Sequence, residues 1–271
     1  MRVVAVVVAA LLVGAAQGAT AQTAEVTMPA KLYAPRDLDV LRGTTVAWHN
    51  ADTTTHTVTE DEDEFDSGFV RPGNTFTVKF SKRGTFVYHC TIHRFMRGSV
   101  SVFDVVLRGP HEPLAAGRKA LLEGVAPAEV TEVVLERVVP GPVESVARAT
   151  PDPEGAFRFS VPAPEPRRYR VRAGSAQSPL VRVRVAPRVT IERRQAGIAV
   201  RALPARSGAP VALQRYDREL FAFVTVARSR LGASSRAVIR YRPRGREHLR
   251  AVVRGTRGWS DGFSRSLVAT P

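Results

Sequence analysis

Three side chains that could bind a metal follow one another closely in the segment YHCTIHRFMRG. Cys90 is the only cysteine of the chain, His93 lies three residues after it, and Met96 three residues further. A thiolate, an imidazole and a thioether are the ligands that soft metal ions prefer. One more donor would complete a four-ligand site, and His56, in the segment NADTTTHTVTE, is the candidate.

This ligand set discriminates between two metals. Two histidines and one cysteine in a plane, with a weak axial methionine, form the type 1 site of blue-copper electron-transfer proteins. Zinc is the competitor, but structural zinc prefers four Cys or His ligands, and copper binds more tightly than zinc in the divalent series. The sequence therefore favours one copper ion.

The remaining histidines are expected to bind no metal: His49, His89, His111 and His248. His49 is the one rival of His56, but it stands beside Trp48 on a predicted strand and is expected at the surface. A copper oxidase or nitrite reductase needs several further histidines for its other copper centres. Since only these four remain, we reject that class of protein for the monomer. The residues also form no catalytic cluster and no phosphate loop, so we expect no enzyme.

The N-terminal segment MRVVAVVVAALLVGAAQGATAQ is typical of a secretory signal. Arg2 is followed by an apolar run from Val3 to Ala16 and by small residues before Gln22, where cleavage is expected. The run is shorter than the roughly 20 residues that span a bilayer. We therefore predict a signal peptide at 1–21, no membrane span after cleavage, and export to the periplasm or the cell exterior.

The formal charge of +15 belongs to the C-terminal half. Residues 22–105 carry nine Lys and Arg against eleven Asp and Glu, whereas residues 106–271 carry 30 against 14. In YRVRAG and VRVRV the arginines alternate with apolar residues, which puts them on one solvent-facing side of a strand. This pattern argues against nucleic acid as a partner and leaves a cell-envelope polyanion as a lesser alternative.

The sequence predicts an all-β protein. Short runs rich in Val, Phe, Tyr and Thr alternate in polarity and end at Gly, Pro, Asn or Asp. The clearest are TTVAWHN (44–50), NTFTVKF (74–80), GTFVYHC (84–90) and GSVSVFDVV (98–106). Such spacing is typical of β-sandwiches.

Two proline-containing breaks divide the chain after the predicted signal. They lie in LRGPHEP (107–113) and near VAPRV (185–189), and they predict domains at 22–106, 107–186 and 187–271. The last two contain a weak repeat: VVLERVV is echoed by VALQRYD, and RRYRVRAG by EHLRAVVRG, about 80 residues later. This period predicts two small immunoglobulin-like sandwiches.

The first domain resembles the cupredoxins of the amicyanin and plastocyanin type over about 25–105. GTFVYHCTIHRFMRGSVSV resembles their ligand loop, VAWHNADTTTHTVT their first-histidine segment, and FDSG with PGNTFTVKFSKRGTF the strands between. The resemblance implies an eight-stranded Greek-key sandwich with copper near one end. It implies His56, Cys90 and His93 as equatorial ligands, Met96 as the axial ligand, and an exposed edge of His93 that passes the electron.

Three positions depart from the family pattern. Amicyanin-like loops commonly carry proline on either side of the second histidine, where this chain has Ile92 and Arg94. A cation at Arg94 is expected to raise the reduction potential, because it favours the less positive copper. Thr57 stands where many relatives have Asn, so the bonds that tie the two ligand loops together need not be those of the family.

The sequence thus predicts an exported blue copper protein that carries single electrons between redox proteins, with spacer or adhesion modules behind it. The alternative is a non-redox protein that captures copper or binds the cell envelope on the same scaffold. The acidic run EDEDEFD (60–66) is expected to be a solvated loop. A docking patch for a basic partner, a weak cation site and a contact with the basic C-terminal half are the other interpretations.

Overall fold

The computed structural model describes residues 22–271 except 142 and 257. The predicted signal at 1–21 lies outside the described residues. All regular elements within the described part are strands, β1 to β25, which confirms the predicted all-β class. The described residues contain no helix with the length and apolar character needed to cross a membrane.

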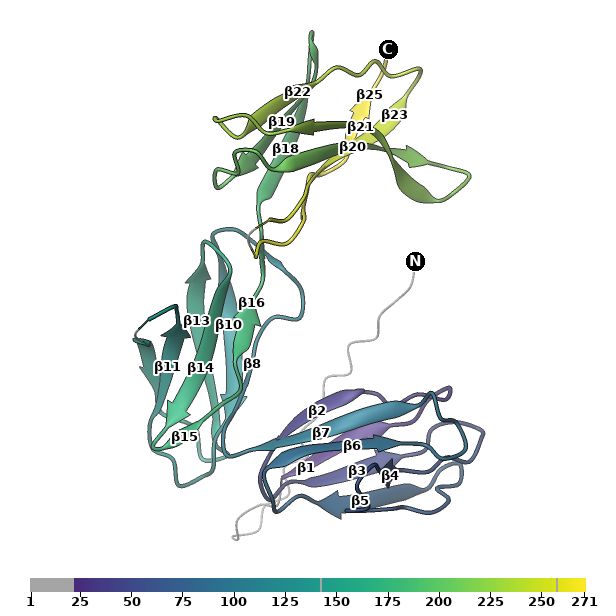
Figure 1. Cartoon of the computed structure of the whole chain (residues 1–271), viewed down its shortest axis with the longest axis vertical. Coiled ribbons are helices and arrows are strands. Elements are labelled where there is room, and N and C mark those ends of the chain that lie inside the picture. The colour runs from purple at the N-terminus through teal and green to yellow at the C-terminus, as the bar shows by residue number, and fades with distance from the viewer. Residues whose placement is uncertain (1–21, 142, 257) are drawn as a thin grey trace.

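The first unit consists of two sheets that face each other (Figure 1). One has the strand order β1-β3-β5 and the other β2-β7-β6-β4. Their bounds are β1 (Thr23–Thr27), β2 (Asp37–Leu41), β3 (Thr45–His49), β4 (Thr59–Glu60), β5 (Thr75–Lys79), β6 (Gly84–His89) and β7 (Arg97–Phe103). The resemblance implied eight strands. The described residues of this unit form seven, and His56 pairs with Val70 only as an isolated bridge.

Alternation along these strands builds the core between the sheets. In β3, Val46 and Trp48 are fully buried, while their neighbours are partly exposed. In and after β6, Tyr88 and Cys90 share the buried side, as the parity of the segment predicts. The rings of Trp48 and Tyr88 meet edge to face with centroids 5.4 Å apart. Burial of such a side chain contributes about 1.5–3 kcal/mol, so this core anchors the strand that leads into Cys90.

The strand predicted over 98–106 is divided in the structure. The strand β7 ends at Phe103, and β8 (Val106–Arg108) begins a different sheet. The side chain of Asp104 lies between two arginines, with its carboxylate oxygens 3.0 Å from Arg42 and 3.3 Å from Arg83. The buried Val105 already packs in the core of the second unit. Apolar residues on both sides of Asp104 made the segment look like one strand in the sequence.

Each of the next two units pairs a three-stranded sheet with a five-stranded one. In the second unit the orders are β13-β10-β8 and β12-β11-β14-β15, with β16 also paired to β14. Its further strands are β9 (Leu114–Ala115), β10 (Arg118–Val125), β11 (Val133–Val138), β12 (Glu144–Ala149), β13 (Ala156–Ala163), β14 (Arg167–Ala173), β15 (Ala176–Gln177), β16 (Val181–Val183) and β17 (Val185–Ala186). The short strands β9 and β17 pair in parallel.

The third unit has the orders β18-β19-β22 and β21-β20-β23-β24, with β25 paired to β23. Its strands are β18 (Arg188–Arg194), β19 (Gly197–Leu203), β20 (Pro210–Asp217), β21 (Ala222–Arg230), β22 (Arg236–Ile239), β23 (Glu247–Val253), β24 (Gly262–Phe263) and β25 (Leu267–Ala269). The second and third units have separate cores. The domain limits at 106 and 186 stay predictions.

Irregular details recur in the second and third units at the places where the sequence repeat puts them. The register shifts after Leu135 in the pairing of β11 with β12 and after Leu213 in that of β20 with β21. The hydroxyl of Ser178 accepts the N–H of Val171 at 2.9 Å. The hydroxyl of Ser264 accepts the N–H of Ala251, the corresponding residue of β23, also at 2.9 Å. These shared irregularities support an origin of both units from one repeated sequence.

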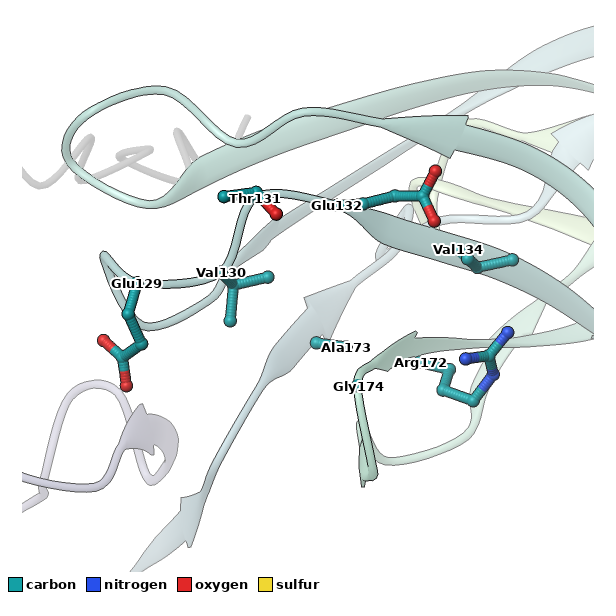
Figure 2. A pocket seen from close by; sticks show the side chains of 8 residues that line it. All are labelled: Glu129, Val130, Thr131, Glu132, Val134, Arg172, Ala173 and Gly174. Atoms are coloured by element: carbon teal, nitrogen blue, oxygen red, sulfur yellow. The ribbon is translucent and has the colours of Figure 1, made fainter.

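A cleft of about 380 Å³ in the second unit is lined by Val130, Glu132 and Arg172 among others (Figure 2). Two of its charged groups already have partners: Glu132 accepts from Arg148 at 2.6 Å, and Arg172 donates to Glu136 at 3.0 Å. This cleft therefore offers no free charged group from these two side chains to a ligand.

Candidate metal centre

Two loops of the first unit bring the predicted ligands together. His56 lies between β3 and β4, and its backbone exchanges two hydrogen bonds with Val70, of 3.1 and 2.8 Å. The second loop joins β6 to β7. It is closed by the N–H of Cys90, which donates to the carbonyl of Met96 at 3.1 Å, and by the N–H of Met96, which donates to that of His93 at 2.8 Å. Backbone bonds therefore hold both loops in position.

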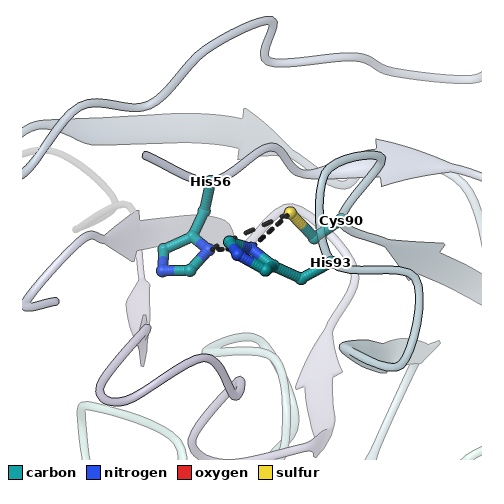
Figure 3. Close-up of side chains that lie close together, drawn as sticks. All are labelled: His56, Cys90 and His93. Carbon is teal, nitrogen blue, oxygen red and sulfur yellow. Dashed lines mark hydrogen bonds between the residues drawn. The ribbon is translucent and has the colours of Figure 1, made fainter. Parts of the chain in front are cut away.

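The side chains of His56, Cys90 and His93 converge on one point (Figure 3). The two Nδ1 atoms lie 3.2 Å apart, and the Cys90 Sγ lies 3.9 Å from Nδ1 of His56 and 3.8 Å from that of His93. Two ligand atoms on one ion, with bonds of about 2.0–2.3 Å, are separated by no more than roughly 4.6 Å. The three donors therefore fit a single metal ion.

The fourth predicted donor lies in the same core. Met96 is 2% exposed and packs in the cluster that contains Cys90. His56 and Cys90 are fully buried, whereas His93 is partly exposed. Partial burial and the neighbouring His56 ring lower the pKa of His93, which favours the neutral imidazole that a metal requires. The role of these four residues as ligands remains a prediction.

Thr57 ties the two loops together. Its N–H donates to the Cys90 Sγ at 3.3 Å, and its hydroxyl accepts the N–H of Thr91 at 2.8 Å. The carbonyl of Thr57 accepts the hydroxyl of Tyr33 at 2.6 Å. Burial raises the pKa of Tyr33, as does the neighbouring Cys90, so this phenol stays a donor. Thr57 therefore links the two ligand loops by hydrogen bonds, although many relatives carry Asn at this position.

Asp52 is a residue of the site that the sequence reasoning missed. Its Oδ2 lies 3.0 Å from Nε2 of His56, on the side of the ring that faces away from Cys90. The hydrogen bond with His56 holds the pKa of the Asp52 carboxyl well below its usual range. A carboxylate at this position keeps the proton on Nε2 and leaves the lone pair of Nδ1 free for a metal. The only sequence signal was an acidic residue four positions before a candidate ligand.

The other histidines do not join this group within the described part of the chain. His49 is partly exposed on β3 and lies 3.1 Å from the hydroxyl of Thr75, as expected for a surface residue. His89 is paired with Asp61 through Nδ1 at 2.7 Å. His49 therefore lies outside the group formed by His56, Cys90 and His93.

The acidic run makes its contacts within the first unit. Asp61 bonds to His89 and Arg97, and Glu64 lies 3.2 Å from Lys82. No ion pair of this run with the C-terminal half is found among the described residues. The solvated-loop interpretation therefore fits best, with some of its charge locally neutralised.

Exposed apolar side chains surround the partly exposed ligand. Phe95 is 73% exposed, and its ring centroid lies 6.0 Å from that of His93. Ile92 belongs to the same loop and is also exposed, and so is Phe69, which directly precedes the Val70 that pairs with His56. Such a group at a ligand's edge is suited to contact another protein.

Comparison with known proteins found relatives for the first unit. A family model described as a cupredoxin-like domain matches residues 2–102. Amicyanin-alpha of Methylorubrum extorquens is 32% identical over 102 residues, which cover 35% of this chain and 86% of that protein. A solved structure described as a novel purple cupredoxin from Nitrosopumilus maritimus has 28% identity, covers 29% of this chain and 98% of its own, and gives a TM-score of 0.28.

A reduced Cu(I) form of an amicyanin mutant is similar at 31% identity, with 29% of this chain and 79% of that chain covered and a TM-score of 0.28. Amicyanin-alpha is matched over most of its length, and on this ground the chain belongs to the cupredoxin family, whose members bind copper.

Proposed function

We propose that this protein is an exported carrier of single electrons that holds one type 1 copper ion through His56, Cys90, His93 and Met96. The observation that carries the proposal is the convergence of two imidazoles and one thiol, from two distant loops, within the separations that one ion allows. Copper bound there would supply the one-electron couple between Cu(II) and Cu(I).

The chain's own contribution is to hold the ligands still. Both loops are closed by backbone hydrogen bonds, and Thr57 joins them. A ligand set held in one arrangement needs little rearrangement when its charge changes, which favours fast electron exchange. The N–H of Thr57 stabilises the negative charge of the Cys90 sulfur, and Asp52 fixes the orientation of His56.

We place the docking surface for a redox partner at the exposed edge of His93. The apolar side chains of Ile92 and Phe95 would contact the partner there, while Arg94 adds a positive charge on the same loop. An electron would enter or leave through the ring of His93, since it is the one equatorial candidate that reaches the surface. Substitution of Phe95 by Ser would test this by slowing exchange with an oxidised partner.

Export is the second part of the proposal. It rests on the apolar run from Val3 to Ala16 with small residues before Gln22. Mass determination of the mature N-terminus after expression with an intact leader tests it. We further propose that the two C-terminal units are immunoglobulin-like spacer or adhesion modules, which their paired sheets and repeated irregularities support.

Optical spectroscopy of the purified, copper-loaded protein tests the electron-carrier role. The bond between the Cys90 thiolate and Cu(II) should give an intense visible absorption that a mild reductant removes and an oxidant restores. Substitution of Cys90 by Ser should abolish it. A colourless complex, or one that does not cycle, would support copper capture without redox function instead.

A further inference from the structure

A second cleft, of about 700 Å³, lies at the end of the five-stranded sheet of the second unit. It lies where β11 ends, β14 begins and β16 pairs with β14, and its charged lining consists of five arginines and one glutamate: Arg137, Arg167, Arg168, Arg182, Arg184 and Glu165. Figure 1 shows β14 and β16 in this unit, and their pairing is antiparallel. No part of the cleft belongs to the predicted copper site.

One wall of this cleft comes from the third unit. The segment around Trp259 crosses over, and its indole packs against the core of the second unit. The N–H of Ser260 donates to the carbonyl of Val185 at 2.9 Å, and the guanidinium of Arg206 stacks on the indole at 4.5 Å. Gly258 and Ser260 then line the cleft. It is therefore enclosed by an anchored segment and not by a single sheet face.

Two arginines of this cleft have no carboxylate beside them. Arg168 and Arg182 stand directly opposite each other on β14 and β16, and both are exposed. Neither has a hydrogen-bond or ion-pair partner among the residues that the structure describes. Two like charges directly opposite on neighbouring strands are destabilising. An anion bound between them would offset this repulsion.

The other arginines of the cleft differ from this pair. Arg137 pairs with Glu144 through its terminal nitrogen, but its Nε is buried and has no partner within the described structure. Arg167 is paired with Glu165 at 3.1 Å. Counting both carboxylates against the five guanidinium groups leaves a net charge of +3 around the cleft.

We propose that this cleft binds a phosphate group. A phosphate carries up to two negative charges and three strong acceptor oxygens, which can accept from the guanidinium groups of Arg168 and Arg182, since these two residues stand opposite each other on one face of the sheet. A carboxylate offers one charge and two oxygens, and would leave most of the positive charge unbalanced. Guanidinium groups present planar pairs of donors that suit phosphate oxygens. The phosphate could belong to a small free compound or to a phosphate-bearing polymer.

Calorimetric titration of the full-length protein with inorganic pyrophosphate tests the proposal. We expect saturable binding at one site, weakened at least about tenfold in the double variant Arg168→Gln/Arg182→Gln, because charge-assisted hydrogen bonds are lost. The variant Arg137→Lys changes an arginine opposite the buried Tyr169, on the other face of the sheet, and it should bind pyrophosphate within about twofold of the unmodified protein. Far-UV circular dichroism shows whether each variant is folded.

The chain offers a matched control. Arg201 and Arg236 also stand opposite each other, on β19 and β22, and are exposed, but they do not line the cleft. The double variant Arg201→Gln/Arg236→Gln removes the same charge and should bind pyrophosphate within about twofold of the unmodified protein. An equal loss in both double variants would mean that net charge alone is sensed, and would overturn the proposal.

Two further titrations separate the sources of the phosphate. Long-chain polyphosphate that binds more tightly per phosphate than pyrophosphate, and still requires Arg168 and Arg182, would identify a polymer. Equal binding per phosphate would identify a small compound. If polygalacturonate competes as well as either, or if pyrophosphate does not bind, the cleft has no phosphate site.

Discussion

The carboxylate of Asp52 lies 3.0 Å from Nε2 of His56, the ring nitrogen on the side away from Cys90, while Nδ1 of the same ring lies 3.2 Å from Nδ1 of His93. One side of the imidazole is thus fixed by the protein and the other is directed at the proposed metal. Asp52 is itself held by the N–H of Lys31 at 2.9 Å and that of Thr53 at 2.6 Å. The orientation of this ligand is therefore set by a bonded loop and not by its own rotamer preference.

Replacement of Asp52 by Asn should weaken copper binding. The amide oxygen of Asn can accept the Nε2–H of His56 but carries no charge. Loss of an outer hydrogen-bond partner of a metal ligand typically lowers metal affinity by about 10–100-fold. We expect a loss in that range, measured by competition with a chelator. Asp61→Asn is the control, because Asp61 forms the same kind of pair with His89 outside the site. Equal affinities of the Asp52 and control variants would show that Asp52 does not position His56.

Replacement of Thr57 by Val should loosen the two ligand loops. Valine keeps the shape and the backbone N–H to Cys90 but removes the hydroxyl that accepts from Thr91. Loss of a buried acceptor costs about 1–2 kcal/mol of unfolding free energy. Chemical denaturation of the copper-free protein measures it. Thr85→Val, which removes an exposed hydroxyl 3.0 Å from Ser101, should change stability by less than about 0.5 kcal/mol.

Gly98 on β7 is required by the ring that packs over it. A Cβ at this position would lie 2.6 Å from the hydroxyl oxygen of Tyr88 and 2.9 Å from the carbonyl of Arg36. We expect Gly98→Ala to destabilise the first unit by about 1–3 kcal/mol, since neither the buried ring nor the backbone can move away without cost. Thermal unfolding followed by tryptophan fluorescence, with Trp259 replaced by Phe in both proteins, reports on Trp48 in this core. An unchanged midpoint would contradict the packing argument.

Gly245→Ala is the matched control for that variant. A Cβ at Gly245 meets nothing within 4 Å, so the substitution should be close to neutral. A similar loss in both variants would point to a general effect of the substitution on the backbone.

The sequence was sufficient to predict what depends on residue type and parity. The buried side of β6 and the outward arginines of β14 follow from parity. The spacing of Cys90, His93 and Met96 indicated three candidate ligands and the residue type of His56 a fourth, and their roles as ligands stay predictions. The role of Asp52 could not be predicted, because an acidic residue in a polar loop has the same pattern whether it is solvated or bonded to a ligand. Its partner is fixed only by the folded path of the loop.

The partners of side chains on neighbouring strands could not be predicted from the sequence either. The alternation in YRVRAG predicts that Arg170 and Arg172 face outward, but not that both donate to Glu136, at 2.8 and 3.0 Å. That contact depends on the register between β11 and β14. The division of the expected 98–106 strand was missed for a related reason: both halves are apolar, and only their partners differ.

Acid should destabilise the second unit through Glu136. Burial of this carboxyl acts to raise its pKa, but hydrogen bonds from Arg170 and Arg172 and their charges outweigh it and lower the pKa below its usual value. A lowered folded-state pKa adds stability above the unfolded value of about 4.3, which is lost as the pH falls through the folded pKa. We expect Glu136→Gln to cost of order 1 kcal/mol at pH 7 and progressively less below about pH 4.

Denaturation of both proteins at neutral and acidic pH measures this difference. The third unit supplies an internal comparison, because Gln214 occupies the corresponding position and accepts from Arg250 at 2.8 Å. A constant difference between the proteins at all pH values would rule out the ionised carboxylate as its origin.

Replacement of Met96 by Leu should keep the visible colour and raise the reduction potential. The colour depends on the Cys90 thiolate, which this change leaves in place. The thioether is proposed as a weak axial donor that stabilises Cu(II) more than Cu(I), so its loss favours the reduced ion. Leucine preserves the buried volume at this position, so the first unit should remain folded. Redox titration monitored by visible absorption measures the shift, and an unchanged or lowered potential would exclude Met96 as an axial ligand.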